Sequence, residues 1–420
     1  MRENLTVKDI INKKNIFRFF KNIGFFFLII SPILIFFLST YLYQLSIPDA
    51  KDPFIQFSGL DPKTEAYVTW ETEKKESSTV WYGNDSSNLD LNETNAEEVT
   101  IHRLKISDLE PNTKYYYKVG VDGSDPIYRS DIFSFTTAPN DTATDFNFAI
   151  YSDSQIFYGI GWHRRICEAI AQFDDLSFVS IAGDLAQNWD YKPDWNQFFY
   201  DSTLYLRKYP IVPIMGNHDG YYPEEDPNAE LHWYETYFGA TNTTSDPHSF
   251  YYAFNWSNTL FVMAEISKGG DENPDTPRNK AHDVWLNRTL AMAQDKAFRI
   301  LIFHRQVFSA EADNPTLINR IVPIVEKYNV SLVMYGHHHH YERFLHNDHT
   351  YICLGGGGSP QFGSNYFNPG EETQVFAMGP SYTKFSITSD TISGTTFTPE
   401  NDILDSFNLK LEGSEAILQE

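Results

Sequence analysis

The chain has 420 residues, which is enough for two domains with a large hydrophobic core. Its formal net charge of −24 argues against nucleic-acid binding, because recognition of a phosphate backbone requires a basic surface. The two cysteines, Cys167 and Cys353, are too few for a disulfide framework or a zinc cage. Whether they are buried free thiols or form one disulfide stays open at this point.

The N-terminus carries an uncharged apolar run from Ile23 to Tyr43. About twenty such residues can span a bilayer as a helix. Basic residues precede the run, namely Arg2, Lys8, Lys13, Lys14, Arg18 and Lys21. Because positive flanks stay in the cytoplasm, we predict a cytoplasmic basic segment over 1–22, a single-pass transmembrane signal anchor over 23–45, and an extracellular catalytic part. The alternative is a cleaved signal peptide and a secreted protein.

A short polar linker, residues 46–53, leads into a region where only strand patterns occur. Strands are expected at residues 66–70, 78–82, 115–119 and 132–136, separated by polar turns. This pattern predicts an all-β sandwich domain over residues 54–138. The segment from Leu109 to Tyr115 resembles the turn and tyrosine corner of fibronectin type III domains.

From residue 146 onward, apolar strand patterns alternate with helical periodicity. Helices are expected near residues 162–170, 193–206, 229–238, 278–295 and 314–328, and strands and turns return from 381 to 411. The alternation predicts an α/β domain with stacked sheets over residues 146–411.

Five apolar runs in this second region end in residues that can bind metals. They end in Asp153, in Asp184, in Asn217-His218-Asp219, in His304, and in the run from His337 to His340. One such residue after a strand is ordinarily a turn or a helix cap. Because ligands of open α/β sheets bind beyond the carboxyl ends of the strands, five together predict a shared metal site. The glycine turn at Gly336 relaxes strand alternation, so His337 and His339 can both face a metal pair.

The order Asp-x-Gln, Gly-Asp, Gly-Asn-His-Asp, Phe-His-Arg and Gly-His-x-His resembles the calcineurin-like metallophosphoesterases. The string from Gly336 to Arg343 is similar to the purple acid phosphatase branch, whose members carry a similar N-terminal domain. The resemblance covers about Phe54 to Leu411. It implies a four-layer α/β/β/α sandwich, two divalent metal ions (Fe, Mn or Zn), and hydrolysis of small phosphate monoesters by a metal-activated hydroxide.

The same resemblance implies a role for each residue. Asp184 bridges the metals, Asp153 and His339 complete the first metal's ligands, and Asn217, His304 and His337 bind the second. His218 stabilises the transferring phosphoryl group and can protonate the leaving oxygen. Asp219 is expected to hold the imidazole of His218. Arg343 is expected to form a structural ion pair with Glu342 or a neighbour.

The chain departs from the purple branch at two places. Gln187 stands where the branch has a tyrosine ligand, and the segment from Gln306 to Glu311 lacks the branch's extra substrate histidine. Gln155 stands where the wider superfamily has a histidine, and we expect it either to bind the first metal or to hydrogen-bond a ligand. The departures leave the metals and an acidic pH optimum open, and they favour a colourless enzyme that works with divalent ions.

Two other functions compete with monoester hydrolysis. The first is a phosphodiesterase or nucleotide pyrophosphatase that uses the same site. The second is an adhesion or binding protein in which the β-sandwich is the working part and the enzyme domain is dead. The complete ligand set argues against the second alternative.

Overall fold

The computed structural model describes residues 38–39, 42–121, 130–141, 145–156, 161–220, 232–239, 250–266, 277–360 and 367–419. Within these ranges, no helix is both long enough and apolar enough to cross a membrane. The predicted basic segment, residues 1–22, and residues 23–37 and 40–41 of the predicted anchor lie outside the described residues.

The N-terminal region is all-β, as predicted. Its strands are β1 (Lys51–Gln56), β2 (Ala66–Gly83), β3 (Leu91–Ile106), β4 (Lys114–Gly120) and β5 (Phe133–Thr136). The strands expected at 66–70 and 78–82 are one long strand, β2, whose pairing with β3 is irregular between Glu71 and Ser78. The polar residues that suggested a turn lie in this irregular part of β2, between Glu71 and Ser78. The predicted tyrosine corner is present, because the Tyr115 hydroxyl accepts a hydrogen bond of 3.0 Å from the Glu110 amide.

The predicted linker 46–53 is shorter than expected, because β1 begins at Lys51. This strand pairs antiparallel with β2 and meets β8 (Ile211–Pro213) at Gln56 and Ile211. Strand β1 therefore joins the N-terminal strands to the sheet of the second region. The result is one continuous sheet in the described part of the chain, with the order β19-β18-β17-β16-β6-β7-β8-β1-β2-β4-β5 and β3 paired to β2.

The second region adds strands to this sheet and builds another. The first sheet receives β6 (Phe146–Tyr151), β7 (Leu176–Ile181), β16 (Tyr382–Ile387), β17 (Thr391–Phe397), β18 (Ile403–Glu412) and β19 (Glu415–Gln419). The second sheet contains β9 (Tyr252–Trp256), β10 (Thr259–Met263), β11 (Phe298–Ile302), β12 (Leu332–Tyr335), β13 (Tyr341–His346), β14 (His349–Leu354) and β15 (Thr373–Ala377). The first sheet thus continues past Leu411, where the predicted domain ends.

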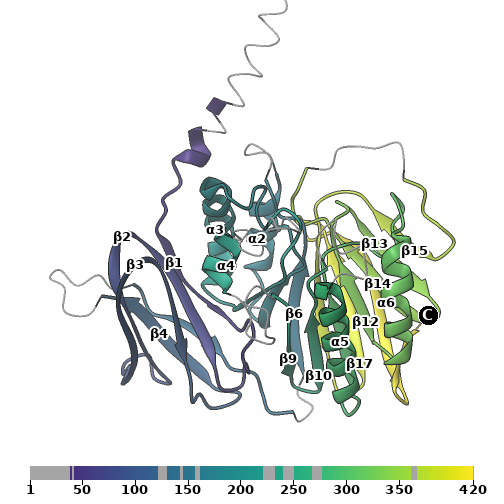
Figure 1. Cartoon of the computed structure of the whole chain (residues 1–420), viewed down its shortest axis with the longest axis horizontal. Helices are drawn as coiled ribbons and strands as arrows, with labels where there is room; N and C mark the ends of the chain where they lie inside the picture. Colours follow the sequence, from purple (N-terminus) through teal and green to yellow (C-terminus); the bar gives the residue numbers. More distant parts are fainter. Residues whose placement is uncertain are drawn as a thin grey trace, which may run out of the picture.

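Helices cover the outer faces of both sheets (Figure 1). Helices α2 (His163–Ile170), α3 (Lys192–Leu206) and α4 (His232–Phe238) share a buried apolar cluster with β6, β7 and β8. Helices α5 (Pro277–Met292) and α6 (Pro315–Lys327) pack on the second sheet. All five lie where helical periodicity placed them, and the arrangement is the predicted four-layer α/β/β/α sandwich.

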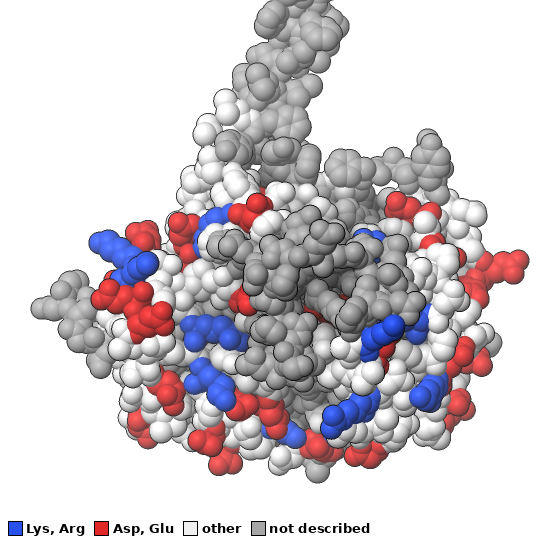
Figure 2. Space-filling model, viewed as in Figure 1, with Lys and Arg blue, Asp and Glu red and all other residues white. Residues whose placement is uncertain are grey.

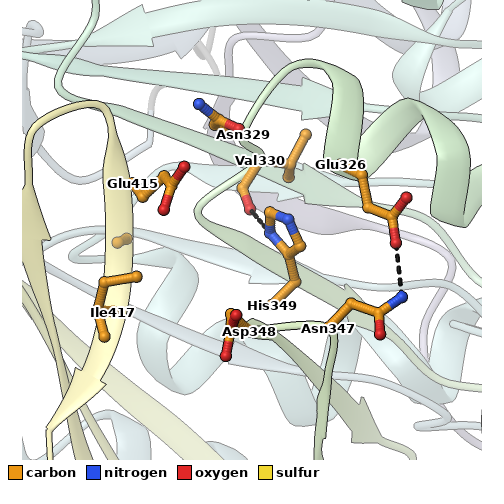
Figure 3. A pocket seen from close by; sticks show the side chains of 9 residues that line it. Glu326, Asn329, Val330, Asn347, Asp348, His349, Glu415 and Ile417 are labelled. Atoms are coloured by element: carbon orange, nitrogen blue, oxygen red, sulfur yellow. Dashed lines mark hydrogen bonds between the residues drawn. The ribbon is translucent and has the colours of Figure 1, made fainter.

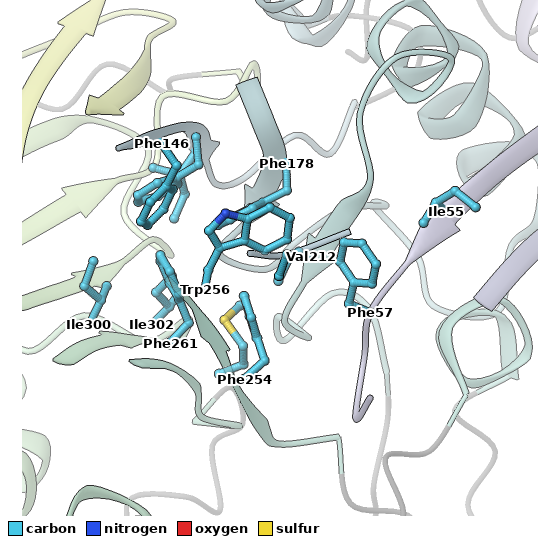
Figure 4. Packing of buried hydrophobic residues seen from close by; sticks show 14 of the residues in the cluster. Ile55, Phe57, Phe146, Phe178, Val212, Phe254, Trp256, Phe261, Ile300 and Ile302 are labelled. Atoms are coloured by element: carbon cyan, nitrogen blue, oxygen red, sulfur yellow. The ribbon is translucent and has the colours of Figure 1, made fainter. Parts of the chain in front are cut away.

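The core between the two sheets is largely aromatic (Figure 4). The ring centroids of Phe148 and Phe178 are 5.2 Å apart, and Phe261 of the opposite sheet meets both rings at 5.3 Å. Each fully buried large apolar side chain contributes about 1.5–3 kcal/mol to folding. This packing fixes the two sheets relative to each other, and so fixes the strand ends that carry the candidate site. Figure 2 shows acidic and basic side chains interspersed on one face of the molecule.

Candidate metal centre

The five predicted ligand blocks meet at one edge of the two sheets. Strands β6, β7 and β8 are parallel neighbours, as are β11 and β12, so their carboxyl ends lie together. Backbone hydrogen bonds join the segments that follow these strands. The amide of Asp153 donates to the Gly183 carbonyl at 3.0 Å, and the amide of Gly336 donates to the His304 carbonyl at 2.9 Å. The loops therefore form one packed unit.

Three of the predicted ligands have left-handed backbone conformations. The φ angles are 61° at Asp153, 56° at Asp184 and 74° at His337. Such conformations are uncommon for residues other than glycine and concentrate at functional sites. Glycine is required at the neighbouring positions Gly216 and Gly336, because ligand atoms lie too close there for a Cβ. A Cβ on Gly216 would collide with Asp184, and a Cβ on Gly336 would collide with Asp153.

The second predicted metal site is compact. One ligand atom from each of Asp184, His304 and His337 lies within 4.8 Å of the others. The Nε2 of His304 is 3.2 Å from Asp184 Oδ2 and 3.1 Å from Asn217 Oδ1. The Nδ1 of His304 lies 2.8 Å from the Ala182 carbonyl, to which it donates, so Nε2 is the ring nitrogen that faces the cluster.

The residues predicted for the first metal site contact one another and Asp184. The Nε2 of His339 is 3.5 Å from Asp153 Oδ1, and its Nδ1 donates to the Pro360 carbonyl at 3.2 Å. The Nε2 of Gln155 is 3.2 Å from Asp184 Oδ2 and 3.3 Å from His339 Nε2. Gln155 therefore touches ligands of the cluster, as both predicted roles require.

The donor set fits a pair of cations. Asp153 Oδ1 and Gln155 Oε1 are buried and accept no hydrogen bond from the described residues. Buried acceptors without donors are costly unless a cation satisfies them. Turning the Gln155 amide by half a turn would exchange its oxygen and nitrogen and point Oε1 at the cluster. The two orientations are nearly indistinguishable in shape.

Burial and the close spacing of the charged side chains shift the pKa values of the predicted ligands. Burial raises the pKa of Asp153, although the charges of His304 and His339 oppose the rise. Burial also opposes ionisation of Asp184, but its interactions with His304 hold its pKa below the ordinary value. Burial and the charge of His304 lower the pKa of His337 to about 2. His337 is therefore a neutral imidazole at physiological pH, which is the form that binds metals.

His218 is held beside the ligands but is not one of the cluster. Its amide donates to Asp184 Oδ1 at 2.8 Å, and its Nδ1 donates to the backbone carbonyl of Gln187 at 2.7 Å. Since Nδ1 is used in this way, Nε2 remains for a substrate. The Nε2 of the Gln187 side chain lies 3.4 Å from His218 Nδ1, so Gln187 stands beside the proposed catalytic histidine.

The expected role of Asp219 is wrong. Its carboxylate does not hold the His218 imidazole, because the Gln187 carbonyl does that. Instead Asp219 Oδ1 accepts from the amides of Leu185 and Ala186 at 2.8 and 3.1 Å, and Oδ2 accepts from the Gly216 amide at 2.8 Å. Asp219 is fully buried and ties the loop after β7 to the loop after β8. Burial and the charge of Asp184 raise its pKa to about 7.

The other residues of the histidine run have separate partners. His338 Nδ1 lies 2.6 Å from Ser309 Oγ, and His340 Nε2 lies 3.0 Å from Glu342 Oε2. Arg343 forms the expected structural ion pair, but with Asp405 rather than Glu342, at 2.7 Å from Nε to Oδ2. No sequence signal linked positions so far apart.

Two further features lie apart from the cluster. Cys167 and Cys353 are both buried free thiols, so there is no disulfide between them. A hollow of about 240 Å³ lies between α6 and β19 (Figure 3). Its lining includes Glu326, Asp348 and His349 and none of the predicted site residues.

With the geometry in place, comparison with known proteins identifies the family. Residues 52–137 match the purple acid phosphatase N-terminal domain, and residues 146–341 match the calcineurin-like phosphoesterases. The chain therefore carries a calcineurin-like phosphoesterase domain, preceded by a domain of the purple acid phosphatase N-terminal family. This confirms the resemblance drawn from the motifs.

Individual relatives are distant. Purple acid phosphatase 21 of Arabidopsis thaliana is 26% identical over 275 residues, which cover 62% of this chain and 58% of that protein. Probable purple acid phosphatase 20 of the same plant is 24% identical over 74% of this chain and 75% of its own length. A purple acid phosphatase from yellow lupin (Lupinus luteus) seeds superposes with a TM-score of 0.70 at 17% identity, over 85% of this chain and 74% of that chain. The superposition on the lupin enzyme supports the overall fold described above.

Proposed function

We propose that this protein hydrolyses phosphate monoesters at a centre of two divalent metal ions. The observation that carries the proposal is the position of Asp184. Its Oδ2 lies 3.2 Å from His304 Nε2, a residue assigned to the second metal, and 3.2 Å from Gln155 Nε2, a residue assigned to the first. A carboxylate in that position can bridge two metals, which in such centres lie about 3.5–4 Å apart.

The chemistry divides between the metals and the protein. Bound divalent ions would supply Lewis acidity and lower the pKa of a bound water. The chain supplies the rest. His218 donates Nδ1–H to Gln187, which leaves Nε2 able to contact the phosphoryl group and to pass a proton to the leaving oxygen. Asp219 keeps the Asp184 and Asn217 loops in register.

The proposed metals are divalent and the proposed enzyme is colourless. A phenolate ligand stabilises ferric iron and gives a visible charge-transfer band, and Gln187 has no phenolate. A purple protein that bleaches on reduction would contradict this part of the proposal.

Paired substrates test the reaction class. Purified protein loaded with Mn²⁺ or Zn²⁺ should hydrolyse p-nitrophenyl phosphate faster than bis(p-nitrophenyl) phosphate, and Asp184→Ala should hydrolyse neither. Faster hydrolysis of the diester would favour a phosphodiesterase on the same site. Purified protein that binds neither metal ion and hydrolyses neither ester would favour a binding protein.

We further propose that the apolar run is a retained anchor and that the catalytic region faces the outside of the cell. The support comes from the residues that follow the run. Gln44 is 2% exposed, and its Nε2 donates to Asp194 Oδ1 on α3 at 2.6 Å. Such packing is expected of a segment that stays with the protein. Protease added to intact cells should digest the catalytic region, whereas a protected, cytosolic enzyme would reverse the topology and a soluble form starting near Ser46 would favour cleavage.

A further inference from the structure

The segment that follows the apolar run is fixed against α3. In addition to the bond between Gln44 and Asp194, Asn196 Nδ2 donates to Asp49 Oδ1 at 2.7 Å. The side chain of Ile47 is buried. Figure 1 shows the helical turn over residues 42–45 above α3. The point where the chain leaves the apolar run therefore has a defined place on the catalytic region.

Exposed aromatic side chains occur at the end of the apolar run and on the two helices α2 and α3, which pack against each other. Tyr43 is 51% exposed, Tyr200 of α3 is 41% exposed, and Trp162 at the start of α2 is 45% exposed. The side chains of Tyr43 and Tyr200 are hydrogen bonded. The guanidinium of Arg164 lies 5.1 Å from the Tyr200 ring centre, and that of Arg165 lies 5.0 Å from the Trp162 ring centre. Tyr43, Tyr200 and Arg164 lie together, and Trp162 and Arg165 lie at the beginning of the helix that carries Arg164. These five residues are here called the aromatic face.

This composition suits a membrane–water interface. Tyrosine and tryptophan concentrate at the level of lipid headgroups, because one end of each ring system is apolar and the other is polar. Arginine can place its stem along apolar surface while its guanidinium reaches headgroup phosphates. Here Arg164 also pairs with Glu168 at 3.2 Å and Arg165 with Glu400, so the phosphates would share these guanidinium groups with exposed carboxylates. The apolar run ends at Tyr43, within the aromatic face itself. Tyr43, Trp162 and Tyr200 are the most exposed aromatic side chains among the described residues.

We propose that the aromatic face rests on the outer leaflet of a phospholipid bilayer and holds the catalytic region in one orientation on it. The inference rests on the proposed retained anchor, and it adds a second contact that a flexible tether would not make. The aromatic face also borders the metal centre. The Trp162 amide donates to the Gly358 carbonyl at 2.8 Å, and the adjacent Ser359 amide donates to the Asp153 carbonyl at 2.9 Å. The rim of the centre near Asp153 would thus lie on the bilayer side.

Site-specific fluorescence quenching tests the orientation. Full-length protein carrying Trp162→Cys, Tyr200→Cys or, as the control, Met292→Cys is labelled with a small fluorophore and reconstituted in phosphatidylcholine vesicles. Met292 is 72% exposed and lies on α5, in the layer opposite α2 and α3. The native cysteines are fully buried and stay unlabelled in the folded protein. Each variant is first checked for undiminished turnover of a soluble ester.

Nitroxide groups attached to the lipid headgroups should remove most of the fluorescence at positions 162 and 200 and almost none at 292. Equal quenching at the three positions in vesicle-bound protein would overturn the orientation while leaving the anchor intact. Protein that does not remain with vesicles would overturn both the anchor and the orientation. The phosphatase reaction is scored separately on the soluble ester, so its failure is distinguishable from either outcome.

Discussion

The imidazole of His218 donates from Nδ1 to the backbone carbonyl of Gln187 across 2.7 Å, and this bond fixes which ring nitrogen faces the substrate. With Nδ1–H donated to a backbone carbonyl, Nε2 is the ring nitrogen left to contact a phosphoryl group. In the proposed reaction, His218 is therefore oriented by the backbone carbonyl of Gln187 and not by the adjacent Asp219.

Replacing His218 by alanine should slow hydrolysis without removing metal. The expected loss is roughly 10²–10⁴-fold in turnover, the usual scale for one acid–base group. Turnover on p-nitrophenyl phosphate and metal content by mass spectrometry are measured together. His349→Ala, at the separate hollow in Figure 3, is the matched control and should leave both unchanged. Loss of metal from His218→Ala would make His218 a ligand.

Asp219→Ala should loosen the centre as a whole. The carboxylate accepts hydrogen bonds from three backbone amides, and its removal leaves those amides buried without an acceptor. We expect a loss of at least about 2 kcal/mol in the free energy of unfolding, together with weaker metal binding. Chemical denaturation and metal titration measure the two effects. Unchanged stability and metal affinity with slower turnover would instead support a direct effect on His218.

Gln155→Leu should weaken binding of the first metal, since leucine fills the same space without an oxygen. A decrease of roughly tenfold or more in affinity is expected, and Gln155→His should restore it because imidazole is itself a good ligand. Competition with a chromogenic chelator reports affinity independently of activity. If the leucine variant binds both metals as tightly as the native protein, Gln155 only hydrogen-bonds the ligands.

Arg343→Met should destabilise the fold and spare the reaction. The Arg343 and Asp405 side chains are 9% and 4% exposed, and removing one partner leaves the other charge buried. Such losses cost about 3–5 kcal/mol. Arg207→Met breaks an exposed pair with Asp52 and should cost less than about 1 kcal/mol. Similar unfolding free energies for the two variants, or a specific loss of turnover in Arg343→Met, would contradict a structural role.

Much of the site could be read from the sequence because each ligand follows an apolar run. Parallel pairing of β6 with β7 brings Asp153 and Asp184 together, and the packing of the two sheets brings His304, which follows β11, beside Asp184 although the two are far apart along the chain. The partners of Asp219 and Arg343 could not be read in the same way. Asp219 lies in a turn, where local pattern does not fix side-chain direction, and Arg343 pairs with a residue 62 positions away.

Long-range contacts of the fold could likewise not be predicted from local sequence patterns. Helices and most strands follow from periodicity, and all of the described helices lie at the predicted positions. The pairing of β1 with β8 is a long-range contact through Gln56 and Ile211 that no local pattern signals. The polar stretch inside β2 suggested a turn because an irregular pairing and a turn use similar residues.

Metal titration of the metal-free protein tests the central claim most directly. Chelator-treated protein is supplied with increasing Mn²⁺ or Zn²⁺, and turnover of p-nitrophenyl phosphate is followed against bound metal. Asp174→Ala, at an exposed aspartate, is the control for Asp184→Ala. A centre bridged by Asp184 predicts activity that rises to a plateau at two bound ions per chain, with neither binding nor activity in Asp184→Ala. Full activity after chelation, or activity and two bound ions in Asp184→Ala, would contradict it.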